Sequence, residues 1–163
     1  MALTAQERFK AESLTVIELF QSGTYEIPAF QRDYSWTKDQ CEDLWGDLKN
    51  LLDGQVKAHF IGPMVVIRHG EKNQKSYLVI DGQQRLTTIF MLISLIRDIM
   101  LEEETQNLQT PVSTFDVSHE PISMLFSELA SAQPRFEGNA QIKQDFLDCV
   151  IRNPNDQKRR KFK

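Results

Sequence analysis

The chain has 163 residues and a formal net charge of −4 at pH 7, with 40% hydrophobic and 26% charged residues. This length suits one domain with a sizeable core, and the composition is that of an ordinary globular protein. The negative net charge excludes the overall basic field of a simple nucleic-acid coat protein. Five basic residues crowd the end of the chain, either as a binding surface for DNA or anionic surfaces or as an exposed linker. They are Lys158, Arg159, Arg160, Lys161 and Lys163.

The cysteines and the start of the chain favour a cytoplasmic protein. Cys41 and Cys149 lie in apolar helical patterns and form no CxxC motif, so we expect buried free thiols in a reducing compartment. Five charged side chains within the first twenty residues are unlike a signal peptide. The longest apolar run, residues 89–96, is too short to cross a bilayer, so no membrane partner is expected.

The first elements are predicted to be a helix and a short strand. Thr4 and Glu7 have the spacing of a capping box and open an amphipathic helix that ends at Gly23. Residues 25–30 read as a strand. Because Pro28 has no N–H to donate, this strand should lie at a sheet edge or end there.

A polar and aromatic loop over residues 31–36 leads into a second predicted helix. Thr37 and Gln40 repeat the capping-box spacing, and the helix continues to about residue 53. Its apolar residues recur at helical spacing, which indicates one buried face. They are Cys41, Leu44, Trp45, Leu48, Leu51 and Leu52.

Residues 59–104 are predicted to form a hairpin and a central helix. The strand over 59–67 contains the interruption Gly62-Pro63, and a polar turn over 68–76 connects it to a strand over 77–80. The helical pattern after Arg85 has apolar residues on most of its sides, which is typical of a buried central helix.

The remaining third is expected to be helical. Residues 105–118 read as a loop, and helices are plausible over 121–131 and 139–152. The element order α-β-α-β-β-α-α-α predicts an α+β fold with a small sheet. We divide it into a core over residues 1–104 and a helical extension over residues 105–163.

The most informative motif stands where the strand over 77–80 passes into the long helix. An acid, a glycine, two amides, an arginine and two hydroxyls gather there: Asp81, Gly82, Gln83, Gln84, Arg85, Thr87 and Thr88. The unpaired N–H groups and the dipole of a helix start attract anions. The guanidinium of Arg85 matches the oxygens of a phosphate, and Gly82 lets a ligand approach the backbone closely. The motif therefore predicts a phosphate-handling site.

Two other interpretations of this motif are open. Asp81-Gly82 can be a plain turn, with Gln83 capping the helix and Arg85 in solvent. However, an arginine in the first helical turn opposes the helix dipole unless an anion sits there, which favours the phosphate site. Asp81 could hold Mg²⁺ through waters, or it could orient an arginine.

A second polar cluster lies in the loop over residues 31–36. Gln31 and Arg32 again pair an amide with a guanidinium, beside Tyr34 and Trp36. The two aromatic rings could stack on a base or pack beneath the loop. Two Gln-Arg pairs, each between an extended segment and a helix, predict convergence on one polyanionic ligand.

The sequence gives less support for a metal site or for other known catalytic motifs. His59 could lie near the same site, whereas His69 and His119 have no Cys or His partners at zinc-binding spacing. The chain contains no Walker loop, no GxGxxG and no Gly-x-Ser-x-Gly motif.

The two polar segments, IPAFQRDYSW at residues 27–36 and DGQQRLTT at residues 81–88, carry a family resemblance. They resemble the N-terminal domain of GmrSD-type, modification-dependent restriction systems, within the wider ParB/sulfiredoxin-like group. The resemblance implies a small ParB-like α+β unit that binds and hydrolyses GTP or ATP with Mg²⁺ in phage defence. It also implies a longer protein with a C-terminal HNH-type nuclease domain. Sulfiredoxins place a cysteine where this chain has Gln83, so sulfinic acid reduction is excluded.

The leading hypothesis is therefore a regulatory NTPase domain. Arg85, Gly82, Thr87 and Thr88 would bind the phosphates at the helix start, with Gln31 and Arg32 opposite. Asp81 would place Mg²⁺, and Gln83 or Gln84 would orient the attacking water, since phosphoryl transfer depends mainly on positioning and charge.

Two rival functions and the oligomeric state stay open. The first rival is a DNA-binding module that contacts backbone phosphates through the same arginines and residues 158–161. The second is direct phosphodiester cleavage, which would need a cluster of metal ligands of which only Asp81 is evident. The domain could also form an oligomer.

Overall fold

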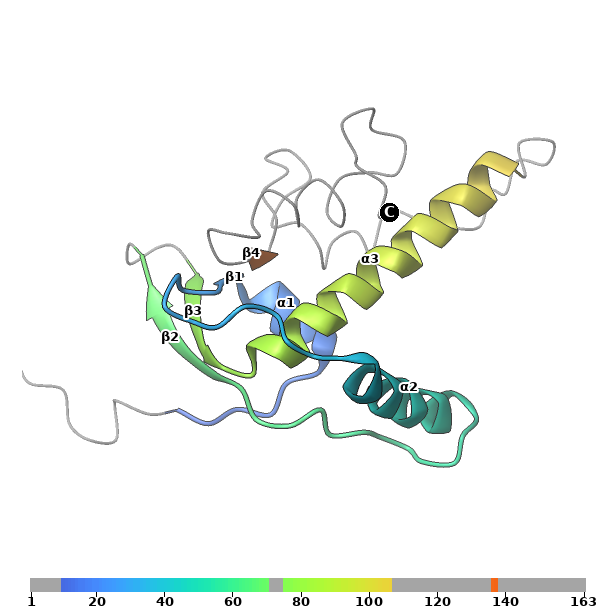
Figure 1. Cartoon of the computed structure of the whole chain (residues 1–163), viewed down its shortest axis with the longest axis horizontal. Coiled ribbons are helices and arrows are strands. Elements are labelled where there is room, and N and C mark those ends of the chain that lie inside the picture. The colour runs from blue at the N-terminus through green and yellow to red at the C-terminus, as the bar shows by residue number, and fades with distance from the viewer. Residues whose placement is uncertain (1–9, 71–74, 107–135, 138–163) are drawn as a thin grey trace, which may run out of the picture.

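The computed structural model describes residues 10–70, 75–106 and 136–137 of the chain (Figure 1). The elements in chain order are α1 Val16–Ser22, β1 Thr24–Glu26, α2 Lys38–Leu52, β2 Val65–His69, β3 Ser76–Asp81, α3 Gln83–Gln106 and β4 Phe136–Glu137. Helices and a small mixed sheet confirm the predicted α+β class. The helices expected over 121–131 and 139–152 lie outside the described residues, and the closer likeness to ParB stays a prediction.

The sheet has the strand order β2-β3-β1-β4. β1 runs parallel to β3 and to the two-residue β4, and β2 runs antiparallel to β3, which confirms the predicted hairpin. Because of these directions, β1 and β3 end at the same edge of the sheet, where β2 begins. In the register of β2 and β3, Val65 lies opposite Asp81. We call this edge the carboxyl edge.

One apolar core joins α1, the sheet and the first half of α3. The buried face of α3 carries Leu86, Ile89, Phe90 and Ile93 at the spacing of an amphipathic helix. The ring of Phe20 from α1 meets that of Phe90 edge-to-face at a centroid distance of 5.6 Å. The core therefore fixes where α3 starts relative to the end of β3.

The first helix begins later than the sequence predicted. Thr15 and Glu18 form a capping box, in which Glu18 N donates to Thr15 Oγ1 over 3.2 Å and Thr15 N donates to Glu18 Oε2 over 2.8 Å. Residues 10–14 are not helical, so a helix running through them from Thr4 is wrong, and residues 1–9 are not described. The helix ends before Gly23 as predicted, where a Cβ would collide with the carbonyl oxygen of Lys75.

β1 and β2 are shorter than predicted because prolines and a glycine interrupt them, whereas β3 extends one residue beyond its predicted range at each end. β1 ends at Glu26, before Pro28, and lies between β3 and β4, so the strand-end alternative is confirmed and the edge alternative is wrong. β2 begins only at Val65, because Gly62 has φ +106° and Pro63 has no N–H to donate.

The two longer helices are less buried than their apolar patterns indicated. The capping box of α2 is present as predicted, but Leu44 is its one fully buried side chain, and Cys41 is half-buried. Cys149 lies outside the described residues. α3 begins at Gln83 and includes residues 105–106, which were expected to be loop. Beyond Ser94 the helix exposes Leu95, Ile96 and Ile99, so the expected burial on most sides does not hold at these three residues.

Within the described part of the chain, none of the helices is both long enough and apolar enough to cross a membrane.

Replacing Phe90 by alanine should strongly destabilise the domain. The side chain is fully buried against Phe20, so its loss leaves a cavity and should lower the free energy of unfolding by about 3–5 kcal/mol. Leu95→Ala on the same helix is the control, because that side chain is 57% exposed and should cost under about 1 kcal/mol. Urea denaturation measures both values, and equal values would contradict this core.

Candidate functional site at the carboxyl edge

The site begins with a tight turn between β3 and α3. Gly82 has φ +88°, and a Cβ there would lie 2.8 Å from Met64 Cγ, so both the backbone and the space require glycine. The Asp81 carboxylate accepts a hydrogen bond from Gly82 N over 2.8 Å. The first helical bond runs from Leu86 N to Gly82 O, so the N–H groups of the three preceding residues have no partner within the helix.

Gln84 binds the backbone of residues 31–36, which we call the site loop. Its Oε1 accepts from Ser35 N at 2.8 Å and from Trp36 N at 3.3 Å, and its Nε2 donates to Asp33 O at 3.1 Å. The residue is only 6% exposed. Gln84 therefore holds three backbone positions of the loop, at Asp33, Ser35 and Trp36, against the first turn of α3.

Gln83 binds the same loop with one half of its amide only. Its Nε2 donates to Arg32 O at 2.7 Å, which identifies the other amide atom as the oxygen. This Oε1 is buried and has no hydrogen-bond partner among the described residues. A buried acceptor without a donor is unfavourable, so this atom favours a donor group brought by a ligand or water.

Gln31 completes the attachment of the site loop. Its Nε2 donates to Ile80 O at 2.8 Å, one residue before the end of β3. The structure thus brings the two polar segments together, as the sequence predicted. The glutamines themselves form the contact between them, which the sequence analysis missed.

The two arginines of the polar segments differ in how they are held. Arg85 is half-buried, and its Nη1 donates to Ile61 O at 3.1 Å, on the side of β2. A Cβ at Gly62 would collide with this guanidinium. Arg32 belongs to the site loop, and its side chain is exposed. In the sequence, only the interruption Gly62-Pro63 indicated that another group approaches this segment closely.

The two threonines of the motif bond back to their own helix. Thr87 is 3% exposed and donates to Gln83 O at 2.7 Å, while Thr88 donates to Gln84 O at 2.8 Å. The Tyr34 hydroxyl lies 2.8 Å from Thr88 Oγ1 and 3.6 Å from Cys41 Sγ, and burial raises the pKa of Tyr34. Tyr34 therefore stays protonated at neutral pH and links the site loop to α2 and α3.

The carboxylate and imidazole groups of the described residues form no preassembled metal centre. In the described ranges, no group of three or more His, Cys, Asp or Glu side chains could hold a metal ion. Asp81 is exposed at the carboxyl edge. His59 Nε2 lies 3.5 Å from Asp47 Oδ2 of α2, so His59 pairs with this helix and not with the residues of the motif. His119 and residues 158–161 are not described, so the proposed DNA-binding run stays a prediction.

Together these features define an α+β domain with a polar site at the start of a helix that follows a strand. One arginine, Arg85, is held at this site, and a second, Arg32, is exposed on the adjoining loop. The chain belongs to the family of N-terminal domains of GmrSD restriction endonucleases, whose family model matches residues 16–163. This confirms the resemblance carried by the two motifs. The chain is also 31% identical over 94 residues to the uncharacterized protein MJ0686 of Methanocaldococcus jannaschii. That match covers 49% of this chain and only 16% of the relative.

Replacing Gln84 by methionine should release the site loop. The change keeps the length of the side chain but leaves two N–H groups and one carbonyl without their partners, at a cost of about 1–3 kcal/mol. Hydrogen exchange should become faster at the amides of Ser35 and Trp36.

Gln55→Met is the matched control, since Gln55 is exposed and its side chain makes no hydrogen bond within the described residues. Unchanged exchange at both amides in Gln84→Met would show that this amide does not hold the loop.

Proposed function

We propose that this domain binds a nucleoside triphosphate, GTP or ATP, at the start of α3 and hydrolyses it with Mg²⁺. In this proposal it is the regulatory part of a DNA-modification-dependent restriction protein. The observation that carries the proposal is Gln83 Oε1, a buried and unpartnered acceptor on the first residue of α3. It lies on the side-chain amide that also contacts the backbone of Arg32, between the helix start and the site loop.

The phosphate groups would bind at the start of α3. The unpaired N–H groups and the dipole of this helix favour an anion. Arg85 is held close by through Ile61 O and would donate to phosphate oxygens, and the exposed Arg32 of the site loop would assist. The held guanidinium of Arg85, assisted by that of Arg32, would stabilise the charge that develops on the transferred phosphoryl group.

Asp81 would supply the protein ligand for Mg²⁺. This ion keeps several waters and is usually held by one or two carboxylates together with the phosphates of the substrate, so an exposed carboxylate beside the helix start fits it. When bound, Mg²⁺ would neutralise charge on the phosphate oxygens.

The proposal gives different roles to the polar residues of the motif. Gln83 Oε1 would accept a hydrogen bond from the attacking water and so orient it, because this atom has no other donor among the described residues. Gln84 positions the site loop, since all three of its hydrogen bonds go to that backbone. Thr87 and Thr88 shape the first turns of the helix through their bonds to Gln83 O and Gln84 O.

The family supports a role in restriction, with DNA and a nuclease domain as partners of the whole protein. The structure offers a route by which nucleotide binding would reach the rest of the molecule. The site loop contacts α3 through Gln83 and Gln84 and contacts α2 through Tyr34 and Cys41. A ligand that moves Arg32 would therefore shift the packing of α2.

Arg85→Ala and Asp81→Ala should each abolish most of the NTPase activity. Loss of a fixed group that stabilises the transition state lowers the rate by about a hundredfold or more. Phosphate release from GTP and from ATP with Mg²⁺ measures this, with Arg68→Ala on β2 as an arginine control outside the site. Rates equal to wild type in both site variants would overturn the assignment, as would no release above background from the full chain.

Gly62→Ala should weaken triphosphate binding although it removes no ligand group. The new Cβ collides with the guanidinium of Arg85, so this side chain must leave its place. Gly54→Ala is a close control: Gly54 also has positive φ, +71°, but a Cβ there meets nothing within 4 Å. Both variants carry backbone strain of about 1–2 kcal/mol, so only a difference in triphosphate affinity between them reports on Arg85. Equal affinities would contradict its role.

A further inference from the structure

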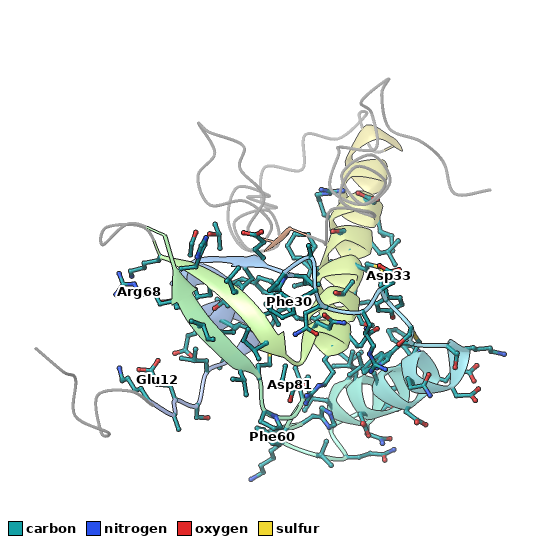
Figure 2. All side chains as sticks on the ribbon, turned by 60° about the vertical axis from the view of Figure 1, so that its left-hand side comes forward. Glu12, Phe30, Asp33, Phe60, Arg68 and Asp81 are labelled. Carbon is teal, nitrogen blue, oxygen red and sulfur yellow. The ribbon has the colours of Figure 1, made fainter. Side chains whose placement is uncertain are left out.

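Two phenylalanines near the carboxyl edge have side chains that are largely exposed to solvent. Phe30 is 77% exposed and Phe60 is 80% exposed. Phe30 directly precedes the site loop, and Phe60 directly precedes the residue whose carbonyl receives Arg85. Figure 2 shows both, with Asp81, near the start of α3. Neither ring belongs to the apolar core.

The backbone next to each ring is fixed on the site. Gln31, next to Phe30, donates to Ile80 O at 2.8 Å at the end of β3. Ile61, next to Phe60, accepts from Arg85 at 3.1 Å. In the sheet, β1 and β2 flank β3, so the segment after β1 and the segment before β2 emerge on opposite sides of its end. The two rings therefore flank the place where α3 begins.

Aromatic rings that are exposed to solvent and attached to an anchored backbone are suited to binding a planar ligand. An exposed aromatic side chain gains little for folding, whereas its face can stack on a flat π-system. Base stacking on aromatic side chains is a common way for proteins to hold nucleotides and single strands. Tyr34 is less suited, because its hydroxyl is bonded to Thr88 and its ring is half-buried.

We propose that Phe30 and Phe60 form the base-binding surface of the site, so that the ligand is held by its base as well as by its phosphates. This inference rests on the proposed nucleotide site. It assigns a binding surface to the base, which is the part of the nucleotide that the arginines do not contact. The phosphates lie over the first turn of α3, and the base stacks against a ring at the flank of the strand end. The deletion of a ring then weakens binding only for ligands that carry a base.

The test compares ligands with and without a base. Affinities of the full chain for ATP, GTP and inorganic triphosphate, each with Mg²⁺, are measured by calorimetry for wild type, Phe30→Leu and Phe60→Leu. We expect a loss of roughly five- to hundredfold for ATP and GTP in at least one variant, the range for one stacked base. The affinity for inorganic triphosphate should not change. Phe30→Tyr and Phe60→Tyr keep a ring and should retain the affinity of the wild type.

Leu52→Ala is the control for an exposed apolar side chain, since Leu52 is 78% exposed at the end of α2. Thermal unfolding checks that the phenylalanine variants fold as the wild type does. Unchanged ATP and GTP affinities in both leucine variants would overturn the aromatic surface while leaving the phosphate site intact. A wild type that binds neither nucleotide nor inorganic triphosphate would overturn both proposals, and equal losses for all three ligands would overturn the role of the rings.

Discussion

The amide of Gln84 is the contact on which the polar site depends. One side chain accepts from two backbone N–H groups and donates to one carbonyl, so it fixes residues 33–36 against α3. Only an amide offers an acceptor and a donor at this reach; a glutamate in its place has no proton to donate at neutral pH. Gln83 donates to Arg32 O of the same loop, and Gln31, which belongs to the loop, donates to Ile80 O near the end of β3. Three amides together therefore make a rigid edge from a loop, a strand end and a helix start.

This arrangement ties the site to the stability of the core. Within the first three turns of α3, Leu86, Phe90 and Ile93 pack in the core, while Gln83 to Arg85 form the site. The helix cannot shift along its axis without breaking both, so core packing sets the position of the helix start relative to β3. Gly82 and Gly62 then allow the close approaches of Met64 and Arg85 that complete the edge. Such preorganisation is what phosphoryl transfer requires from a protein.

Much of the fold was predictable, because local signals and tertiary packing agree there. The hairpin, the Thr37 capping box and the glycine that ends α1 all follow from short-range chemistry. The failures have physical causes. Thr4 and Thr15 both have a glutamate three residues later, and the sequence does not say which pair opens the helix. The exposure of Trp45 and Leu52 reflects the placement of α2 beside the first turns of α3 and away from the sheet, which no helical pattern encodes (Figure 1).

By itself, the sequence determined that two Gln-Arg segments, one of them at a helix start after a strand, form a polar site and mark the family. Residue types at close spacing are enough for this, since a glycine turn and a helix start are local features. Only the tertiary structure decided what each side chain does. Gln84 became a loop anchor through a hydrogen bond to Ser35, 49 positions away, and Arg85 reached Ile61, 24 positions away. The same packing left Gln83 Oε1 buried without a partner among the described residues. Those partners are chosen by the strand order and the packing of α3 against the sheet, because they bring together backbone that is distant along the chain.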